Sequence, residues 1–309
     1  MTRLNSHNCL RIQPIFLLAA LLVSLSGCVT GKEETLANDA AITFASQAVT
    51  KSTGVVTDIN FEGSQYGVFA TKTNLTSGDE SDVFANTPQV VEFSNNKWTY
   101  EPARNWLPQH AYYFVAFYPI SIAETIQFDN EKAVSISSFD ATAQTDLLLS
   151  EPYKNATGFP ALINFRFRHL LCNINISIRM KDTDAQITLN YFKFSGMKVT
   201  GSYSDRNEPK WTLTGNNYTG PLFECTTAEI VTARNKMLFE NILMLPQTIN
   251  EDMLFSFNYT LNGIEYEKQV SLVQKGLTAP WTAGKKITYS LSIASESIEM
   301  IPTVEESEE

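Results

Sequence analysis

Apolar residues recur at every second position over much of this chain, and this period restricts its fold more than any other feature. Between residues 170 and 180 the apolar side chains stand at even positions, with polar side chains at most of the positions between them. The apolar positions are Leu170, Cys172, Ile174, Ile176, Ile178 and Met180. Successive side chains of an extended chain point to opposite faces, so the pattern predicts a strand with one face in a core and the other in water.

Turn residues separate many such alternating runs. The run over residues 255–261 is followed by Asn262-Gly263 and then by a second alternating run. Asn-Gly favours a type I′ turn, in which both central residues need a positive φ, so this segment is predicted to be a hairpin. No long stretch of the sequence shows the 3.6-residue period of an amphipathic helix. Short strands with frequent turns predict an all-β fold built of β-sandwiches.

A change in the parity of the apolar positions divides the chain. Phe165 and Phe167 are apolar at odd positions, whereas the even positions are apolar from Leu170 onward. One strand cannot exchange its faces without a bulge, so we place a crossover between two domains near residues 160–170. The chain is also longer than a single hydrophobic core usually supports. The predicted division is a first β-sandwich over residues 41–165, a second over 166–301, and an acidic tail over 302–309.

The beginning of the chain is typical of an export signal. Residues 1–27 contain two arginines, no acid and an apolar run from Ile15 to Leu25. As a helix this run would rise about 16 Å, well short of the roughly 30 Å hydrocarbon core, so it suits a signal peptide better than a permanent span. Leu25-Ser26-Gly27-Cys28 resembles the lipobox of bacterial lipoproteins. We predict cleavage before Cys28, lipid on its sulfur as a membrane anchor, and a tether over residues 28–40.

A short charged segment follows the cysteine. Lys32-Glu33-Glu34 resembles the signal that sends some Gram-negative lipoproteins to the outer face of the outer membrane. The other interpretation is a plain solvated tether. We predict an outer-membrane, lipid-anchored protein displayed on the cell surface.

Charge and composition argue against several classes of function. Without residues 1–27, which carry two arginines and no acids, the net charge of −10 becomes −12. Such a surface repels phosphate backbones, so no nucleic-acid partner is expected. Beyond the leader only His110 and His169 remain, and neither has a neighbour at a metal-ligand spacing. With no nucleophile elbow, phosphate loop or zinc-protease motif, we predict no catalytic, metal or cofactor site and no enzyme.

Two cysteines and four tryptophans leave alternatives open. Cys172 and Cys225 form either a disulfide in an exported protein or ordinary free thiols. The tryptophans either stack on sugar rings at the surface or pack in cores beside strands. They are Trp98, Trp106, Trp211 and Trp281. Surface stacking would favour a different function, a monomeric surface glycan-binding lipoprotein.

Several motifs in order resemble the fimbrillin family of surface lipoproteins, the subunits of type V pili. The resemblance covers about residues 40–295. It comprises Lys51-Ser52-Thr53, Tyr66-Gly67-Val68-Phe69, Trp106, Tyr113-Phe114-Val115-Ala116-Phe117-Tyr118-Pro119, Thr145-Asp146-Leu147-Leu148, Phe165, Phe167-Arg168-His169-Leu170-Leu171, Leu245-Pro246-Gln247 and Trp281-Thr282-Ala283-Gly284-Lys285-Lys286. The resemblance implies two tandem transthyretin-like β-sandwich domains.

The resemblance also implies assembly by strand exchange. A trypsin-like protease cuts after a basic residue behind the first strand, and a strand from another pilus subunit fills the vacated site. Here the removable first strand would be residues 41–49, with Ile42 and Phe44 pointing inward, and the cut would follow Lys51. The family usually has arginine at that point. An uncut subunit would keep its strand and lipid and act as an anchor.

The end of the chain bears on the subunit's role. Ile298 and Met300 alternate as in a donor strand, but Pro302 removes a donor N–H and acids close the chain. A tip or anchor subunit, which receives a strand and does not donate one, fits this ending. The resemblance therefore predicts a pilus subunit, tip or anchor that serves adhesion, with a host surface ligand or glycan as a further partner.

Overall fold

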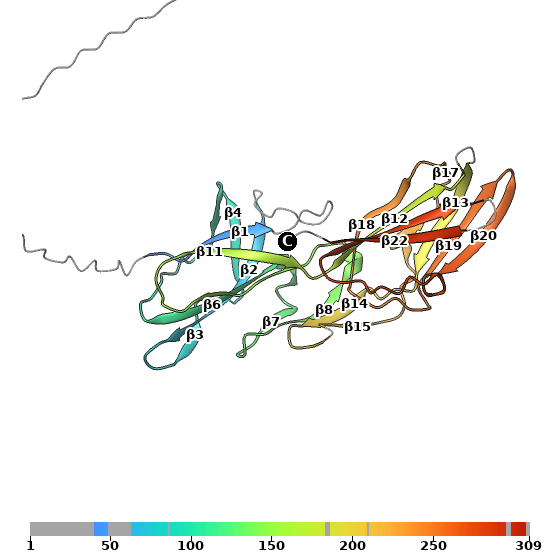
Figure 1. Cartoon of the computed structure of the whole chain (residues 1–309). Coiled ribbons are helices and arrows are strands. Elements are labelled where there is room, and N and C mark those ends of the chain that lie inside the picture. Colours follow the sequence, from blue (N-terminus) through green and yellow to red (C-terminus); the bar gives the residue numbers. More distant parts are fainter. Residues whose placement is uncertain are drawn as a thin grey trace, which may run out of the picture. The chain divides into compact units, whose positions relative to one another are not determined.

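A computed structural model describes residues 40–48, 63–85, 87–182, 186–208, 210–294 and 298–306 (Figure 1). These residues belong to one unit, Asn38–Glu309. Strands dominate the described ranges, and the helical elements there are four short 3₁₀ turns. The predicted all-β fold is therefore confirmed. The turns are η1 (Ile120–Ile122), η2 (Ala141–Ala143), η3 (Pro221–Phe223) and η4 (Val273–Lys275).

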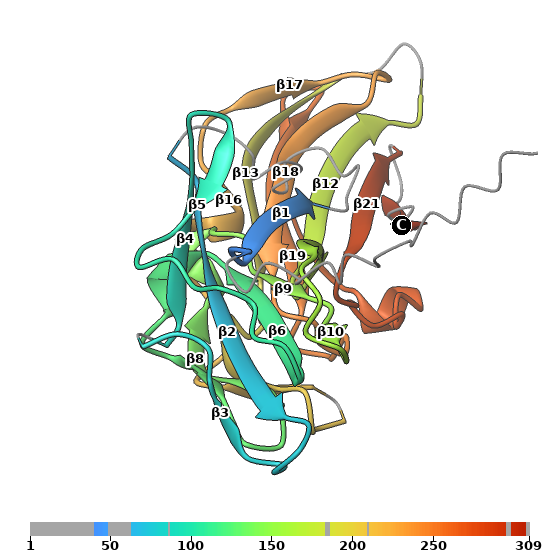
Figure 2. The ribbon, with the colours of Figure 1, turned by 90° about the vertical axis from the view of Figure 1, so that its left-hand side faces the viewer.

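A nine-stranded sheet contains most of the first half of the chain. Its order is β1-β11-β9-β6-β2-β4-β5, with β10 beside β6 and β3 beside β2. Figure 2 shows β1 in the foreground with the β4–β5 hairpin to its left. The strands are β1 (Thr43–Ala48), β2 (Gln65–Asn74), β3 (Glu80–Asp82), β4 (Gln89–Ser94), β5 (Lys97–Thr99), β6 (His110–Tyr118), β9 (Leu148–Ser150), β10 (Tyr153–Asn155) and β11 (Leu162–His169).

Two sheets form the second half and enclose one core between them. The first has the order β18-β12-β21-β22, and the second has the order β16-β13-β19-β20 with β17 beside β13. Their bounds are β12 (Cys172–Met180), β13 (Ile187–Ser195), β16 (Glu224–Cys225), β17 (Glu229–Val231), β18 (Lys236–Met244), β19 (Leu254–Leu261), β20 (Ile264–Ser271), β21 (Lys285–Ile293) and β22 (Ile298–Glu306).

The hairpin predicted from Asn-Gly is present as β19 and β20. Asn262 has φ of 53° and Gly263 has φ of 77°, as a type I′ turn requires. The strands pair from Leu261↔Ile264 to Leu254↔Ser271.

A fourth sheet joins strands from the two halves of the chain. It has the order β15-β14-β8-β7, and its central pair β14 and β8 runs antiparallel. The strands are β7 (Ile126–Phe128), β8 (Val134–Asp140), β14 (Thr200–Ser204) and β15 (Trp211–Thr214). A core cluster that includes Val115, Leu171 and Tyr203 also draws on both halves. The division into two tandem transthyretin-like sandwiches stays a prediction.

The parity break marks the passage from β11 to β12. Burial alternates along β11, and Leu170 and Leu171, which follow it, are both buried. β11 pairs with β9 and β1, whereas β12 pairs with β18 and β21, so the apolar face changes because the sheet changes. The predicted boundary at residue 165 falls inside β11.

The polar side of β12 is buried, and the expectation that it faces water is wrong. Asn175 and Ser177 are 0% exposed, and Ser177 Oγ lies 3.2 Å from Ser290 Oγ of β21. Asn175 Nδ2 donates to Asn173 Oδ1 (2.9 Å), and the Asn241 backbone N–H donates to Asn175 Oδ1 (2.9 Å). Buried polar groups are tolerated when they are hydrogen-bonded, so alternation here reports polarity and not exposure.

The last described residues, up to Glu306, form a strand and not a free acidic segment. β22 runs antiparallel to β21, from Ile293↔Ile298 to Lys285↔Glu306. The predicted tail over residues 302–309 therefore begins inside β22. Within the described ranges the fold has no helix of the length and apolarity that a membrane crossing requires.

Candidate functional site

The first strand lies at one edge of the nine-stranded sheet. β1 pairs in parallel with β11, from Thr43↔Leu162 to Ala48↔Phe167. The segment just before it is also hydrogen-bonded. The Ile42 backbone N–H donates to the Arg104 carbonyl (2.7 Å), and the Trp106 backbone N–H donates to the Ala40 carbonyl (3.0 Å).

The two inward side chains of this segment are buried. Ile42 is 1% exposed and Phe44 is 5% exposed. The Phe44 ring stacks on Phe165, with centroids 5.7 Å apart, and lies 5.3 Å from the Tyr100 ring. Burying a side chain of this size contributes about 1.5–3 kcal/mol relative to water. The structure thus places Ile42 and Phe44 together in a core, while their removability stays a prediction.

We call the cluster beneath β1 the first-strand core. It holds side chains from the motifs that were matched in the sequence, brought together from distant positions. Its aromatic and aliphatic members around β1 are Ile42, Phe44, Tyr66, Phe84, Tyr100, Trp106, Tyr112, Phe114 and Phe165. If the first strand left with Ile42 and Phe44, the remaining side chains would line an apolar groove beside the free edge of β11.

A buried hydroxyl also holds the backbone of the first segment. Tyr100 Oη donates to the Ile42 carbonyl (3.1 Å) and accepts from the Arg104 N–H (3.2 Å). Burial raises the pKa of Tyr100, so the hydroxyl stays protonated and keeps donating at neutral pH. The entry of β1 is therefore fixed by a hydrogen bond as well as by packing.

Gly67 allows the close packing of β2 on β6 in this sheet. A Cβ at this position would lie 2.2 Å from Phe117 Cζ. The Tyr66-Gly67-Val68-Phe69 motif therefore needs glycine because the Phe117 ring occupies the space of a side chain.

Cys28 and Lys51 lie outside the described residues. The predicted lipid site and the predicted cut therefore stay predictions. Lys51 belongs to the segment that connects β1 with β2, so a cut there would separate β1 covalently from all later strands.

Two further motifs meet at a buried aspartate–histidine contact that sequence reasoning missed. Asp146 Oδ2 lies 2.8 Å from His169 Nδ1, and both side chains are almost fully buried. The Leu170 N–H donates to the Leu147 carbonyl (2.8 Å) beside the pair. The sequence held one signal for this contact: an Asp-Leu-Leu segment and, later, a His-Leu-Leu segment, Asp146-Leu147-Leu148 and His169-Leu170-Leu171. The pair fixes the end of β11 where the chain passes to β12.

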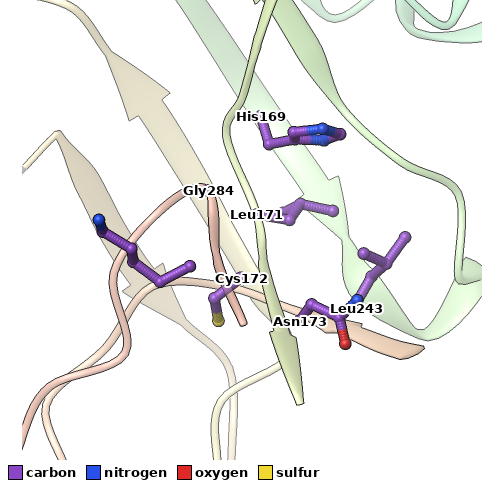
Figure 3. A pocket seen from close by; sticks show the side chains of 7 residues that line it. His169, Leu171, Cys172, Asn173, Leu243 and Gly284 are labelled. Carbon is purple, nitrogen blue, oxygen red and sulfur yellow. The ribbon is translucent and has the colours of Figure 1, made fainter. Parts of the chain in front are cut away.

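A pocket near this pair has the residue types of a nucleophilic site but not the arrangement. Its lining includes His169, Cys172 and Asn173 (Figure 3). The Cys172 thiol at the start of β12 and the His169 ring at the end of β11 point in different directions (Figure 3). The thiol donates to the Met244 carbonyl (3.2 Å), and burial raises its pKa, so it stays neutral. This pocket therefore holds no activated thiolate.

The open alternatives for the cysteines and tryptophans are decided by burial. Cys172 and Cys225 are free thiols. Trp98 is half-buried and lies 4.5 Å from the Tyr66 ring. The other three tryptophans, Trp106, Trp211 and Trp281, are 2%, 6% and 2% exposed. They pack in cores, which removes the exposed platform that the glycan-binding alternative requires.

Among the residues with described positions, no group of three His, Cys, Asp or Glu side chains is placed to hold a metal ion.

Comparison with known proteins gives a family match and fold matches. The family profile described as "Fimbrillin-like" matches residues 50–306. A fimbrial protein from Bacteroides vulgatus is similar in structure, with a TM-score of 0.59 and 15% identity, over 86% of this chain and 99% of that chain.

A candidate cell adhesion protein from Bacteroides uniformis has a TM-score of 0.50 and 16% identity, over 87% of this chain and 98% of that chain. Another, from Bacteroides ovatus, has a TM-score of 0.51 and 13% identity, over 87% and 97%. At these identities the matches show a shared fold. No curated protein matches the sequence.

Proposed function

The chain belongs to the fimbrillin-like family, and from this premise we propose that it is a pilus subunit of the cell surface that accepts a strand from another subunit in place of β1. The proposal is non-enzymatic: the protein's task is assembly and adhesion. The fimbrial and cell adhesion descriptions of its structural relatives support the surface location.

One observation carries the proposal: the first described strand lies at a sheet edge, and its segment buries two side chains, Ile42 and Phe44. Because β1 precedes every other described strand and lies at the sheet edge, its departure would not require any other described strand to unthread. Its departure would expose the unpaired edge of β11 and the places of Ile42 and Phe44. An incoming strand restores main-chain hydrogen bonds and refills these two places, which is β-augmentation.

The processing steps follow from the same reasoning. Lipid on Cys28 would hold the precursor at the outer membrane, and a cut after Lys51 would free β1 together with the lipid. An uncut copy would keep both and act as an anchor. Cut and uncut copies therefore have different places in a pilus.

The pairing of β22 supports a receiving role. A donor subunit must present its last strand to a neighbour, whereas β22 pairs with β21 of the same chain along its whole length. Releasing β22 would break these backbone hydrogen bonds first. A tip subunit, which accepts a strand and keeps β22 on β21, fits this arrangement better than a stalk subunit or an uncut anchor, both of which must donate a strand.

Surface extraction followed by N-terminal sequencing tests the proposal. When cells express the full-length chain, the protein in the polymers should begin at Ser52. These polymers should survive mild heating in detergent and run as ladders on a gel. Lys51→Ala should remove the ladders and leave the lipidated start at Cys28. The matched control is Lys97→Ala, which changes an exposed lysine in the β4–β5 hairpin and should leave the ladders unchanged. Monomers with an intact β1 in every wild-type molecule would contradict polymerisation of this chain.

A further inference from the structure

Three polar atoms in and beside the first-strand core have no hydrogen-bond partner in the described part of the chain. They are Ser64 Oγ, Tyr66 Oη and Trp106 Nε1. The three residues are 4%, 0% and 2% exposed. Buried polar groups in folded proteins are nearly always paired, so three orphans in one half of the molecule require an explanation.

Comparable groups elsewhere in the same molecule are paired. Trp211 Nε1 donates to the Leu170 carbonyl (3.1 Å), and Trp281 Nε1 donates to Tyr289 Oη (2.9 Å). Within the first-strand core, Tyr112 Oη accepts from the Leu107 N–H (2.8 Å). The orphans are thus a property of particular positions and not of tryptophan or tyrosine in this fold.

Tyr66 and Trp106 lie near opposite ends of β1. The Tyr66 ring packs edge-on against Phe165 and Phe167, at 5.9 and 5.7 Å, and these two residues are the β11 partners of the later part of β1. The backbone N–H of Trp106, unlike its indole N–H, has a partner: it donates to the Ala40 carbonyl, where the first segment begins. Between these ends, Ile42 and Phe44 offer only hydrocarbon to the core.

The two larger orphans are donors. An indole N–H can only donate, and burial raises the pKa of Tyr66 well above its ordinary value, so its hydroxyl keeps its proton. A partner must therefore bring an acceptor oxygen. A buried carboxylate would carry a desolvation cost, which leaves the uncharged side chains of Asn, Gln, Ser, Thr and Tyr.

We propose that the site beneath β1 is built for a strand that carries uncharged acceptor side chains among its inward apolar ones, and that β1 is a weaker, temporary occupant. This inference rests on the strand replacement proposed above. β1 fills the volume of the core and leaves its donors unpaired, and the incoming strand of another subunit pairs them. Tyr66 and Trp106 then select which strand enters and favour the replacement over the original.

The first test compares two tyrosine-to-phenylalanine variants of the full chain. Tyr66→Phe removes an unpaired hydroxyl, so the melting temperature of the uncut protein should stay the same or rise. Tyr112→Phe is the matched control: it removes a paired hydroxyl from the same core and should lower the melting temperature. An equal loss in both variants would mean that Tyr66 is already paired in the uncut protein, and would overturn the inference.

The second test measures strand capture. A full chain with a specific protease site directly after Lys51 is cut and mixed with excess labelled peptide. One peptide copies residues 40–50, and a second carries Ile42→Gln. Dissociation of each is followed for the wild-type protein and for Trp106→Phe. The lifetime of the glutamine peptide divided by that of the unchanged peptide should be about tenfold larger for the wild-type protein than for Trp106→Phe.

The outcomes separate this inference from the proposed function. If the copy of residues 40–50 exchanges but the lifetime ratio is the same in both proteins, strand replacement stands and acceptor selection at Trp106 is wrong. The same comparison with the Phe44→Tyr peptide and the Tyr66→Phe protein examines the other donor. If the lifetime ratio changes in neither pair of proteins, the inference is overturned. If no peptide enters the cut protein at all, both proposals fail.

Discussion

The first-strand core and the core of the second half are built from similar aromatic side chains but differ in how complete they are. In the second half the buried polar groups of β12 bond to one another and to neighbouring strands, as Asn175 does with Asn173 and Asn241. In the first-strand core Tyr66 and Trp106 keep unpaired donors under an edge strand. The difference is what our proposal expects, in which one core is finished within the chain and the other is completed by a partner.

The largest expected effect concerns the packing of β1. Phe44→Ala should lower the free energy of unfolding by about 3–5 kcal/mol, because a buried ring is replaced by a cavity. Denaturant unfolding of the uncut chain measures this. The control Phe159→Ala removes a ring that is 53% exposed and should change stability by no more than about 0.5 kcal/mol. Equal effects would mean that β1 is not held by its side chains.

Alkaline titration probes the second core. Burial raises the pKa of Tyr289 to about 12. The folded state holds this proton more tightly than the unfolded state, so its contribution is complete below about pH 10 and is lost as the pH rises toward 12. The total is on the order of 2–3 kcal/mol, and Tyr289→Phe should make unfolding less dependent on pH in that window. An unchanged pH dependence would refute a buried, neutral Tyr289.

Removing one amide from the buried polar side of β12 compares a paired group with an unpaired one. Asn175→Ala should cost about 1–3 kcal/mol, because it leaves the Asn241 N–H without its acceptor. Ser64→Ala, which removes an unpaired hydroxyl, should cost less than about 0.5 kcal/mol. Chemical denaturation of both variants gives the comparison. Similar costs would erase the distinction between a finished and an unfinished core.

The smallest effect is expected where the two halves meet at the surface. Arg206 binds Asp129 (2.6 Å) and Glu131 (2.8 Å), linking the β14 end of the fourth sheet to its β7–β8 turn. These side chains are partly exposed, so Arg206→Ala should cost no more than about 1 kcal/mol, and less in high salt. Thermal unfolding at two salt concentrations checks this. A larger loss would mean that ion pairs, and not strand pairing, join the halves.

Local patterns predicted much of the fold. The alternation over residues 170–180 and the Asn262-Gly263 turn gave strands and a hairpin where the structure has them. The partner of β1 could not be derived, because β11 lies more than a hundred residues away and pairs in parallel. The pairing of β8 with β14 across the halves has no local signal for the same reason. Period also failed to show that Asn175 is buried, since burial depends on which parts of the folded chain cover that face of β12.

The candidate site was predicted in part. Ile42 and Phe44 were singled out by alternation together with a family resemblance, and the structure places both in a core. Their packing in one core with Tyr66, Tyr100 and Trp106 could not be predicted from the sequence, because these residues belong to segments that only the folded sheet brings together. The unpaired donors could not be anticipated either, since whether a buried indole is paired depends on atoms within about 3 Å of it.

The replaceability of β1 is the central claim, and strand exchange without unfolding tests it most directly. The full chain, cut after Lys51, is incubated with an isotope-labelled peptide of residues 40–50 and analysed by intact mass together with amide hydrogen exchange. We expect one labelled strand to replace the original in each molecule while β12 and β21 stay protected throughout. Entry of the peptide only under conditions where β12 and β21 also lose their protection would show that β1 is an integral part of the fold, and would contradict the account.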